Sequence, residues 1–229
     1  MFAMNFEYRF DAGVLKMREL VLSGELGAVQ VLRFINNWSA HGIQGEAGKR
    51  RARFMQDGGG SLDCGIHYVD LARFLSGSEF QSISAYGQWA EPEFRGPGHM
   101  IVQSRMANGA LALLESSFIY THSSKTKLIF MQVELIGERG VVAWCTPPRT
   151  PGGSFEVQQD ELHIVTDERT EVIPFSTDKQ FATTYDEWTQ CLRQGSLAGS
   201  RLATVEDGSA ATCFMWESLA MAERERAAH

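Results

Sequence analysis

Hydrophobic and polar residues follow two periods along the chain, and the change from one to the other marks the predicted elements. Apolar residues recur every three to four positions in four segments, which is the helical period. The predicted helices cover about residues 11–23, 62–75, 181–194 and 205–226. Alternation, or a short apolar run between turn residues, predicts strands. The predicted strands cover residues 1–10, 28–37, 81–90, 100–107, 110–120, 128–136, 141–145, 154–157, 162–166 and 172–174.

Helices before and after a long run of strands indicate an α+β fold. Short turns such as Asn108-Gly109 separate the middle strands, and such turns favour antiparallel pairing. We therefore expect a mostly antiparallel open sheet with helices packed on one face.

Composition excludes several classes of protein. The 229 residues are 44% hydrophobic, which argues against intrinsic disorder, and the net charge of −7 argues against nucleic acid or an anionic membrane as a partner. No apolar run approaches the roughly 20 residues that span a bilayer, and the first residues lack the basic region of a secretory signal. The four cysteines lie far apart, which favours free thiols in the cytoplasm.

The richest candidate chemistry lies in residues 58–70, GGGSLDCGIHYVD. At about 100° per residue, Asp63, His67 and Asp70 share one arc of the predicted helix with Phe74. Because burying an unpaired charge is costly, ionisable groups on such an arc are either paired or functional.

Three interpretations of this arc remain open. In the first, His67 exchanges a proton near neutral pH while a carboxylate holds the imidazole or a substrate hydroxyl. In the second, the groups form a satisfied polar cluster that tethers the helix inside the fold. In the third, Asp63 and His67 bind a metal, but no second ligand pair with convincing spacing is present, so no metal site is predicted.

Residues 58–70 resemble the signature of the Gfo/Idh/MocA oxidoreductases, the relatives of glucose–fructose oxidoreductase and inositol dehydrogenase. The second domain of that family carries three glycines, then Asp-x-x-x-His followed by Asp. Four further segments are similar to family elements in the expected order: residues 5–10 (an Asn-x-Arg-Phe strand, with one extra residue), 20–27 (Ser-Gly-x-Ile-Gly), 108–110 (a turn) and 204–219 (the last helix).

The resemblance implies roles for the two central residues. His67 would exchange the proton of a substrate hydroxyl, and Asp63 would bind and orient a sugar, inositol or similar polyol. Hydride would pass to or from NAD or NADP. The exposed face of the sheet often forms subunit contacts in this family, so we expect a homo-oligomer.

Two family elements are absent from the sequence: a Gly-rich phosphate loop after a strand, and a Glu-Lys-Pro motif. We therefore expect residues 1–10 to be the remnant strand of a missing nucleotide-binding domain, and 11–229 to form the substrate and oligomerisation domain. Binding of the cofactor by this chain alone is not expected, and a separate Rossmann-domain polypeptide is a possible partner. An apolar edge strand invites pairing, so residues 1–10 should dock on the fold or on another subunit.

Three residues are candidate substrate contacts. Arg53 closes the basic cluster 49–53, just before the glycines, although such clusters are often solvated loops. Tyr120 follows a predicted strand, and Arg9 lies on the strand that resembles Asn-x-Arg-Phe; both could equally be surface residues.

The sequence thus favours the substrate-binding and proton-transfer domain of an NAD(P)-dependent oxidoreductase. The alternative is a binding or oligomerisation module that keeps the fold without the chemistry. A metal-dependent hydrolase built on Asp63 and His67 is the least favoured hypothesis.

Overall fold

The computed structural model describes residues 1–38, 59–89, 96–117, 129–149, 159–176 and 179–228. Its helical elements are η1 (Glu7–Phe10, a 3₁₀ helix), α1 (Ala12–Leu22), η2 (Ser61–Gly65, a π-helix), α3 (Ile66–Ser76), α5 (Phe181–Gln194) and α6 (Val205–Ala228). Its strands are β1 (Val29–Trp38), β2 (Ser84–Gln88), β3 (His99–Arg105), β4 (Leu111–Ser117), β5 (Ile129–Gly137), β6 (Gly140–Arg149), β7 (Gln159–Thr166) and β8 (Thr170–Ser176).

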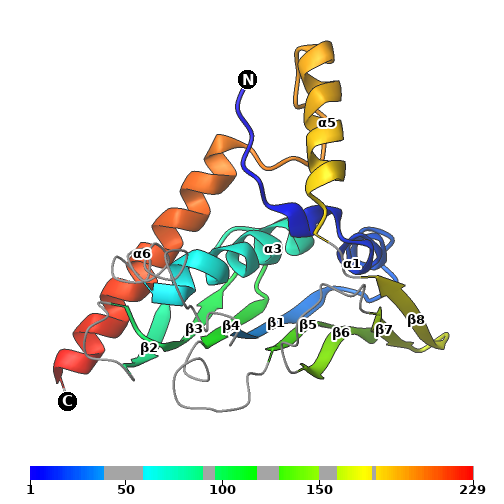
Figure 1. The fold of residues 1–229 in the computed structure, drawn as a ribbon. Helices are drawn as coiled ribbons and strands as arrows, with labels where there is room; N and C mark the ends of the chain where they lie inside the picture. The colour runs from blue at the N-terminus through cyan, green and yellow to red at the C-terminus, as the bar shows by residue number, and fades with distance from the viewer. Residues whose placement is uncertain (39–58, 90–95, 118–128, 150–158, 177–178, 229) are drawn as a thin grey trace.

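The strands form one open sheet in the order β2-β3-β4-β1-β5-β6-β7-β8. Neighbouring strands are antiparallel except for β1 and β4, which run parallel. Figure 1 shows the helices on one side of this sheet, with α6 crossing the β2 end and α1 lying above the β8 end. The predicted α+β fold with a mostly antiparallel sheet is confirmed. The parallel pair was not predicted.

The main core lies between the sheet and the helices. Leu32 and Phe34 of β1 are fully buried beneath Leu71 of α3, and Met17 of α1 belongs to the same cluster. On the opposite face of the sheet, large apolar side chains remain exposed; they are Tyr86, Ile101, Leu111, Val165 and Val172. Among the described residues, helices therefore cover only one face of the sheet.

The N-terminal segment departs from its predicted form. Residues 1–10 do not form a strand: Met4 makes one bridge to Ala203, and the chain then tightens into η1. Phe6 is buried whereas Phe2 is 82% exposed. The expected docking is thus found from Met4 onward and not at Phe2. The strand prediction was wrong because Phe6 and Phe10 pack in two different apolar clusters. The 3₁₀ turn between them directs the two side chains to these separate clusters.

The predicted helices are confirmed with one irregularity. Asp11 caps α1 by accepting a hydrogen bond from the Gly13 amide at 2.8 Å, and Gly77 ends α3 with a φ of 61°. The predicted helix 62–75 instead begins with the π-turn η2. The predicted strand 154–157 lies outside the described residues.

Candidate active site

The site lies where η2 passes into α3. Asp63 belongs to η2, and His67 is the second residue of α3. Gly65 between them lets this segment approach β4, because a Cβ at Gly65 would come within 2.8 Å of Ser116 Oγ. The sheet therefore fixes the depth at which His67 sits.

The imidazole of His67 is enclosed on one side and accessible on the other. Its side chain is 22% exposed, but the Nδ1 atom is buried and has no hydrogen-bond partner. The rings of Phe6 and Tyr8 meet it edge to face, with centroids 5.5 Å and 5.4 Å away. Nδ1 is therefore not among the exposed atoms of the ring.

His67 is set to accept a proton at neutral pH. Burial lowers its pKa below 6.5; the carboxylates of Glu7 and Asp63 oppose this effect, and the Lys179 ammonium adds to it. Because the net shift is downward, the imidazole is neutral at pH 7 and carries a free nitrogen lone pair. A neutral, partly accessible imidazole can act as a general base.

Asp63 and His67 occupy different environments although they are four residues apart. The Asp63 side chain is exposed, and the Cys64 thiol donates to its Oδ2 at 3.7 Å. Its carboxylate acts on the charge state of His67. Asp63 can therefore accept a hydrogen bond from a polar ligand while His67 handles a proton.

Glu7 and Lys179 join this site, and the sequence analysis missed both. The buried carboxylate of Glu7 accepts a hydrogen bond from Lys179 Nζ at 2.6 Å through Oε1. Its Oε2 lies 3.7 Å from His67 Nδ1. Their partners are 60 or more positions away in the chain, so no local sequence signal could have identified either residue.

Two buried tyrosines complete the wall behind His67. Tyr8 stacks on Tyr68 with ring centroids 6.1 Å apart, and their hydroxyls share a hydrogen bond. Burial, reinforced by the charge of Glu7, raises the pKa of both phenols far above 10. Both hydroxyls therefore stay protonated, and neither competes with His67 as a base.

Asp70 does not join the site, which corrects the predicted single arc of three ionisable groups. It is completely buried and accepts two hydrogen bonds from Arg9, at 2.8 Å from Nε and 2.5 Å from Nη2. Asp70 differs from His67 because both of its carboxylate oxygens are bonded by Arg9. The π-turn η2 also changes the angle between Asp63 and His67 from that of a regular helix.

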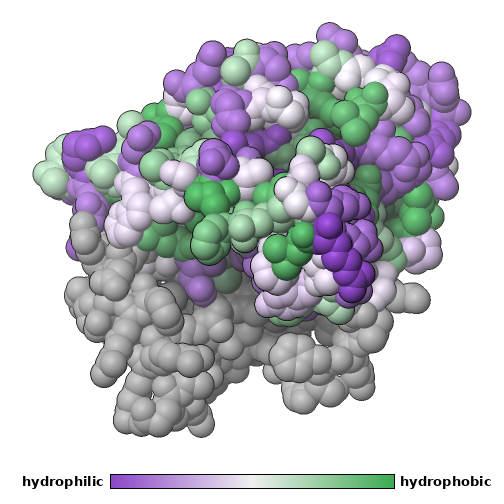
Figure 2. Space-filling view, turned by 90° about the horizontal axis from the view of Figure 1, so that it is seen from above, coloured by the Kyte–Doolittle hydropathy of each residue, from purple (hydrophilic) through white to green (hydrophobic). Residues whose placement is uncertain are grey.

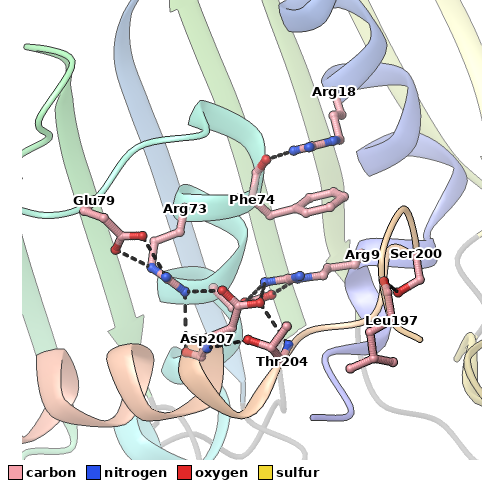
Figure 3. Close-up of polar contacts among 10 residues, drawn as sticks. Arg9, Arg18, Arg73, Phe74, Glu79, Leu197, Ser200, Thr204 and Asp207 are labelled. Carbon is pink, nitrogen blue, oxygen red and sulfur yellow. Dashed lines mark hydrogen bonds and ion pairs between the residues drawn. The ribbon is translucent and has the colours of Figure 1, made fainter. Parts of the chain in front are cut away.

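Arg9 is a buried structural residue in the described chain. Its guanidinium also lies 3.2 Å from Asp207, which pairs with Arg73, and Arg73 in turn binds Glu79. Figure 3 shows Arg9 and Arg73 both pointing at Asp207, at the start of α6. The second interpretation of the sequence, a polar cluster that tethers the helix, thus describes Asp70.

The other candidates lie elsewhere. Arg53 and Tyr120 are outside the described residues. Among the residues that are described, no group of three His, Cys, Asp or Glu side chains could hold a metal ion. None of the four cysteines forms a disulfide, and none of the described helices is long and apolar enough to cross a membrane.

The surface on the helix side is mixed. Figure 2 shows hydrophobic patches among hydrophilic residues there. Large exposed apolar residues on this side include Phe2 at the N-terminus, Leu22 of α1 and Tyr185 of α5. The first residues and α5 project from the layer of helices in Figure 1.

Comparison with known proteins supplies the family. The model of the GFO/IDH/MocA C-terminal domain matches residues 14–143. Over 86 residues, the chain is 30% identical to scyllo-inositol 2-dehydrogenase (NAD(+)) of Bacillus subtilis, covering 37% of this chain and 23% of that protein.

Solved structures show the same fold. Aldose-aldose oxidoreductase from Caulobacter crescentus, complexed with glycerol, superposes with a TM-score of 0.73 at 20% identity over 97% of this chain and 62% of that one. An Agrobacterium radiobacter oxidoreductase in complex with NAD+, L-tartaric acid and magnesium gives 0.69 at 16% identity, over 95% and 62%.

The chain spans about three fifths of the length of the solved structures that it matches. At such identities they establish the fold alone. The family model, however, matches more than half of the chain and includes both Asp63 and His67. The chain belongs to the GFO/IDH/MocA family and has the fold of that family's C-terminal domain.

Proposed function

We propose that this chain is the substrate-binding and proton-transfer domain of an NAD(P)-dependent oxidoreductase that acts on a hydroxyl of a sugar, inositol or similar polyol. One observation carries the proposal: a neutral, partly accessible His67 lies beside the exposed carboxylate of Asp63. The related inositol dehydrogenase and the glycerol complex of the aldose-aldose oxidoreductase agree with a polyol or sugar substrate.

The backbone at Gly59 does not favour a dinucleotide site. Gly59, before η2, has the positive φ of a phosphate-loop glycine, but a Cβ there would meet Pro97 O at 3.2 Å and Gly96 Cα at 3.3 Å. This backbone is packed against its own chain and leaves no cradle for a pyrophosphate. We therefore place the cofactor on a separate dinucleotide-binding domain, where it would accept the hydride when bound.

The chain's own residues supply the remaining steps. Asp63 accepts a hydrogen bond from a substrate hydroxyl and orients the carbon that bears it. His67 removes the proton of the reacting hydroxyl when the substrate is oxidised, and returns it in the reverse direction. The wall formed by Phe6, Tyr8 and Tyr68 keeps water from the buried side of the imidazole.

The far face of the sheet is the proposed oligomer interface. Tyr86 and Ile101 lie opposite each other on β2 and β3, and Val165 and Val172 are exposed on β7 and β8. Isolated exposed apolar residues are ordinary, but several on one uncovered sheet face favour an interface between subunits. The absence of disulfides agrees with a cytoplasmic location.

Calorimetry tests the proposal. The purified chain is titrated with NAD(H) and NADP(H), alone and then with a dinucleotide-binding polypeptide encoded next to it, where one exists. We expect no binding to the chain alone, and binding with polyol oxidation in the presence of the partner. Absence of binding in both conditions would favour the alternative, a non-catalytic binding or oligomerisation module with this fold.

A further inference from the structure

Glu7 is an unusual residue to find beside an imidazole that handles protons. Its side chain is only 4% exposed, and a buried carboxylate requires a counter-charge. Lys179 provides that charge on Oε1 at 2.6 Å, and Lys179 also lies 5.1 Å from the centre of the Tyr8 ring. The other oxygen of Glu7 remains directed at His67, 3.7 Å from Nδ1.

The chemistry of these two groups restricts their protonation. An ionised carboxylate only accepts hydrogen bonds, and a neutral imidazole carries its proton on one of two nitrogens. Because Oε2 faces Nδ1, the favourable arrangement places the proton on Nδ1. The lone pair then lies on Nε2, at the opposite end of the ring from the buried atom.

We propose that Glu7 is a positioning residue for His67: its buried carboxylate, held by Lys179, fixes the imidazole proton on Nδ1 and leaves Nε2 as the atom that accepts a proton from substrate. The inference rests on the proposed function, since it assigns the accepting atom of that site. A carboxylate that orients an imidazole is a recurrent arrangement in acid–base catalysis. At 3.7 Å the two atoms do not form a hydrogen bond in the unliganded chain; catalytic hydrogen bonds are often long before substrate binds.

The other charged and titratable groups near His67 cannot take this part. Asp63 is exposed, whereas Nδ1 is buried, and Lys179 offers only donors. The hydroxyls of Tyr8 and Tyr68 bond to each other, and Cys64 donates to Asp63. Among these groups, Glu7 alone combines burial, negative charge and an oxygen near Nδ1.

The tautomer of His67 provides the test. Long-range proton–nitrogen NMR spectra of the nitrogen-15-labelled 229-residue chain distinguish Nδ1–H from Nε2–H, and the His67→Asn spectrum identifies the signals among the six histidines. In the unmodified chain at neutral pH we expect Nδ1–H as the major form. In Glu7→Leu, which removes the acceptor, we expect Nε2–H to become the major form.

Two matched variants separate positioning from charge. Asp63→Asn also removes a carboxylate that acts on His67, so the pKa of His67 should fall while the tautomer stays Nδ1–H. Lys179→Met removes the counter-charge that holds the buried Glu7 carboxylate, so the share of Nδ1–H should fall towards that seen in Glu7→Leu. If Glu7→Leu does not fold, Glu7→Gln replaces it. The pKa of His67 in Glu7→Gln must then be lower than the pKa of His67 in the unmodified chain.

Either of two results would overturn the inference: Nε2–H as the major form in the unmodified chain, or Nδ1–H as the major form in Glu7→Leu. Where Glu7→Gln takes the place of Glu7→Leu, a pKa of His67 that does not fall would overturn it. Both measurements use the chain without cofactor or substrate. Failure of the proposed oxidoreductase activity would leave them unaffected, so the two proposals fail separately.

Discussion

The helical segment 61–76 meets the N-terminal residues twice, and the two contacts are built differently. At Asp70 the contact is a buried ion pair with two short hydrogen bonds from Arg9, extended through Asp207 to Arg73. One turn earlier, His67 and Glu7 face each other at 3.7 Å, and Nδ1 has no hydrogen-bond partner.

The difference shows how one segment can serve both stability and chemistry. Removing either partner of a fully bonded, buried ion pair is costly, because it leaves the other charge buried without a partner. An imidazole with one loosely paired nitrogen and an accessible opposite side can gain and lose a proton. Rigid pairing at Arg9 and Asp70 therefore holds in place the turn whose reactive group is left incompletely bonded.

Removing the reactive side chain should have the largest effect on activity. In an assembly that carries out the complete reaction, His67→Ala should lower kcat by roughly 10²–10⁴, the usual contribution of a general acid or base. Steady-state kinetics measures the loss, and thermal unfolding checks that the variant is folded. Unchanged turnover would reject the role of His67.

Breaking the ion pair should act on stability instead. Arg9→Met leaves Asp70 buried without its partner and should lower the free energy of unfolding by about 3–5 kcal/mol, measured in urea. Arg9→Lys keeps the charge but not the paired hydrogen bonds. Its free energy of unfolding should lie between those of the unmodified chain and Arg9→Met. A loss below about 1 kcal/mol would contradict the structural role given to this pair.

Gly65 directly precedes α3, which carries both His67 and Asp70. A methyl group at Gly65 should therefore disturb both contacts. Gly65→Ala should cost about 1–3 kcal/mol, because the added Cβ would lie 2.8 Å from Ser116 Oγ. The double variant Gly65→Ala/Ser116→Ala should recover most of that loss, since the next atom of Ser116 lies 3.7 Å away. Equal stability of the single and double variants would refute the contact.

The pH dependence of unfolding should come partly from His67. Its pKa is lowered in the folded state, so as pH falls through 6.5 the unfolded chain takes up a proton that the folded chain does not. Stability should therefore decrease as the pH is lowered across this window. His67→Gln should flatten the slope between about pH 7.5 and pH 5.5 in urea titrations; an unchanged slope would show that other groups cause it.

The smallest effect should come from the outer end of the ion-pair network. Glu79 is bound to Arg73 but is largely exposed, and exposed pairs contribute about 0.2–1 kcal/mol. Glu79→Ala should therefore destabilise the chain by no more than that and lose the effect at high salt. A cost similar to that of Arg9→Met would show that the network acts as one unit.

Local periodicity was sufficient for most elements of the fold. The bounds predicted for α5 match the structure, and α1 begins after Asp11 as its capping chemistry predicts. Residues 1–10 were mispredicted because alternation within a segment says nothing about which distant clusters its aromatics join. The parallel register of β1 and β4 is likewise a property of the whole sheet.

The candidate site was only partly predictable. Asp63 and His67 stand in a recognisable spacing within a few residues, so sequence alone could select them. Glu7 is a polar position in the predicted strand 1–10, and Lys179 lies between two predicted elements and carried no prediction. Their position near His67 results from chain reversals over 60 and 112 residues, respectively, which single-sequence patterns do not encode.

The central place of β1 has a consequence for how the chain acquires its structure. Strands β5 to β8 form a meander of neighbours and can assemble from local contacts. Strand β1 must wait for β4, some 80 residues later, and then for β5, before both of its edges are paired. Distant pairings of this kind slow folding. Helix α6 follows the described strands in the chain and packs on β2, so a growing chain would leave β2 exposed until α6 has been made.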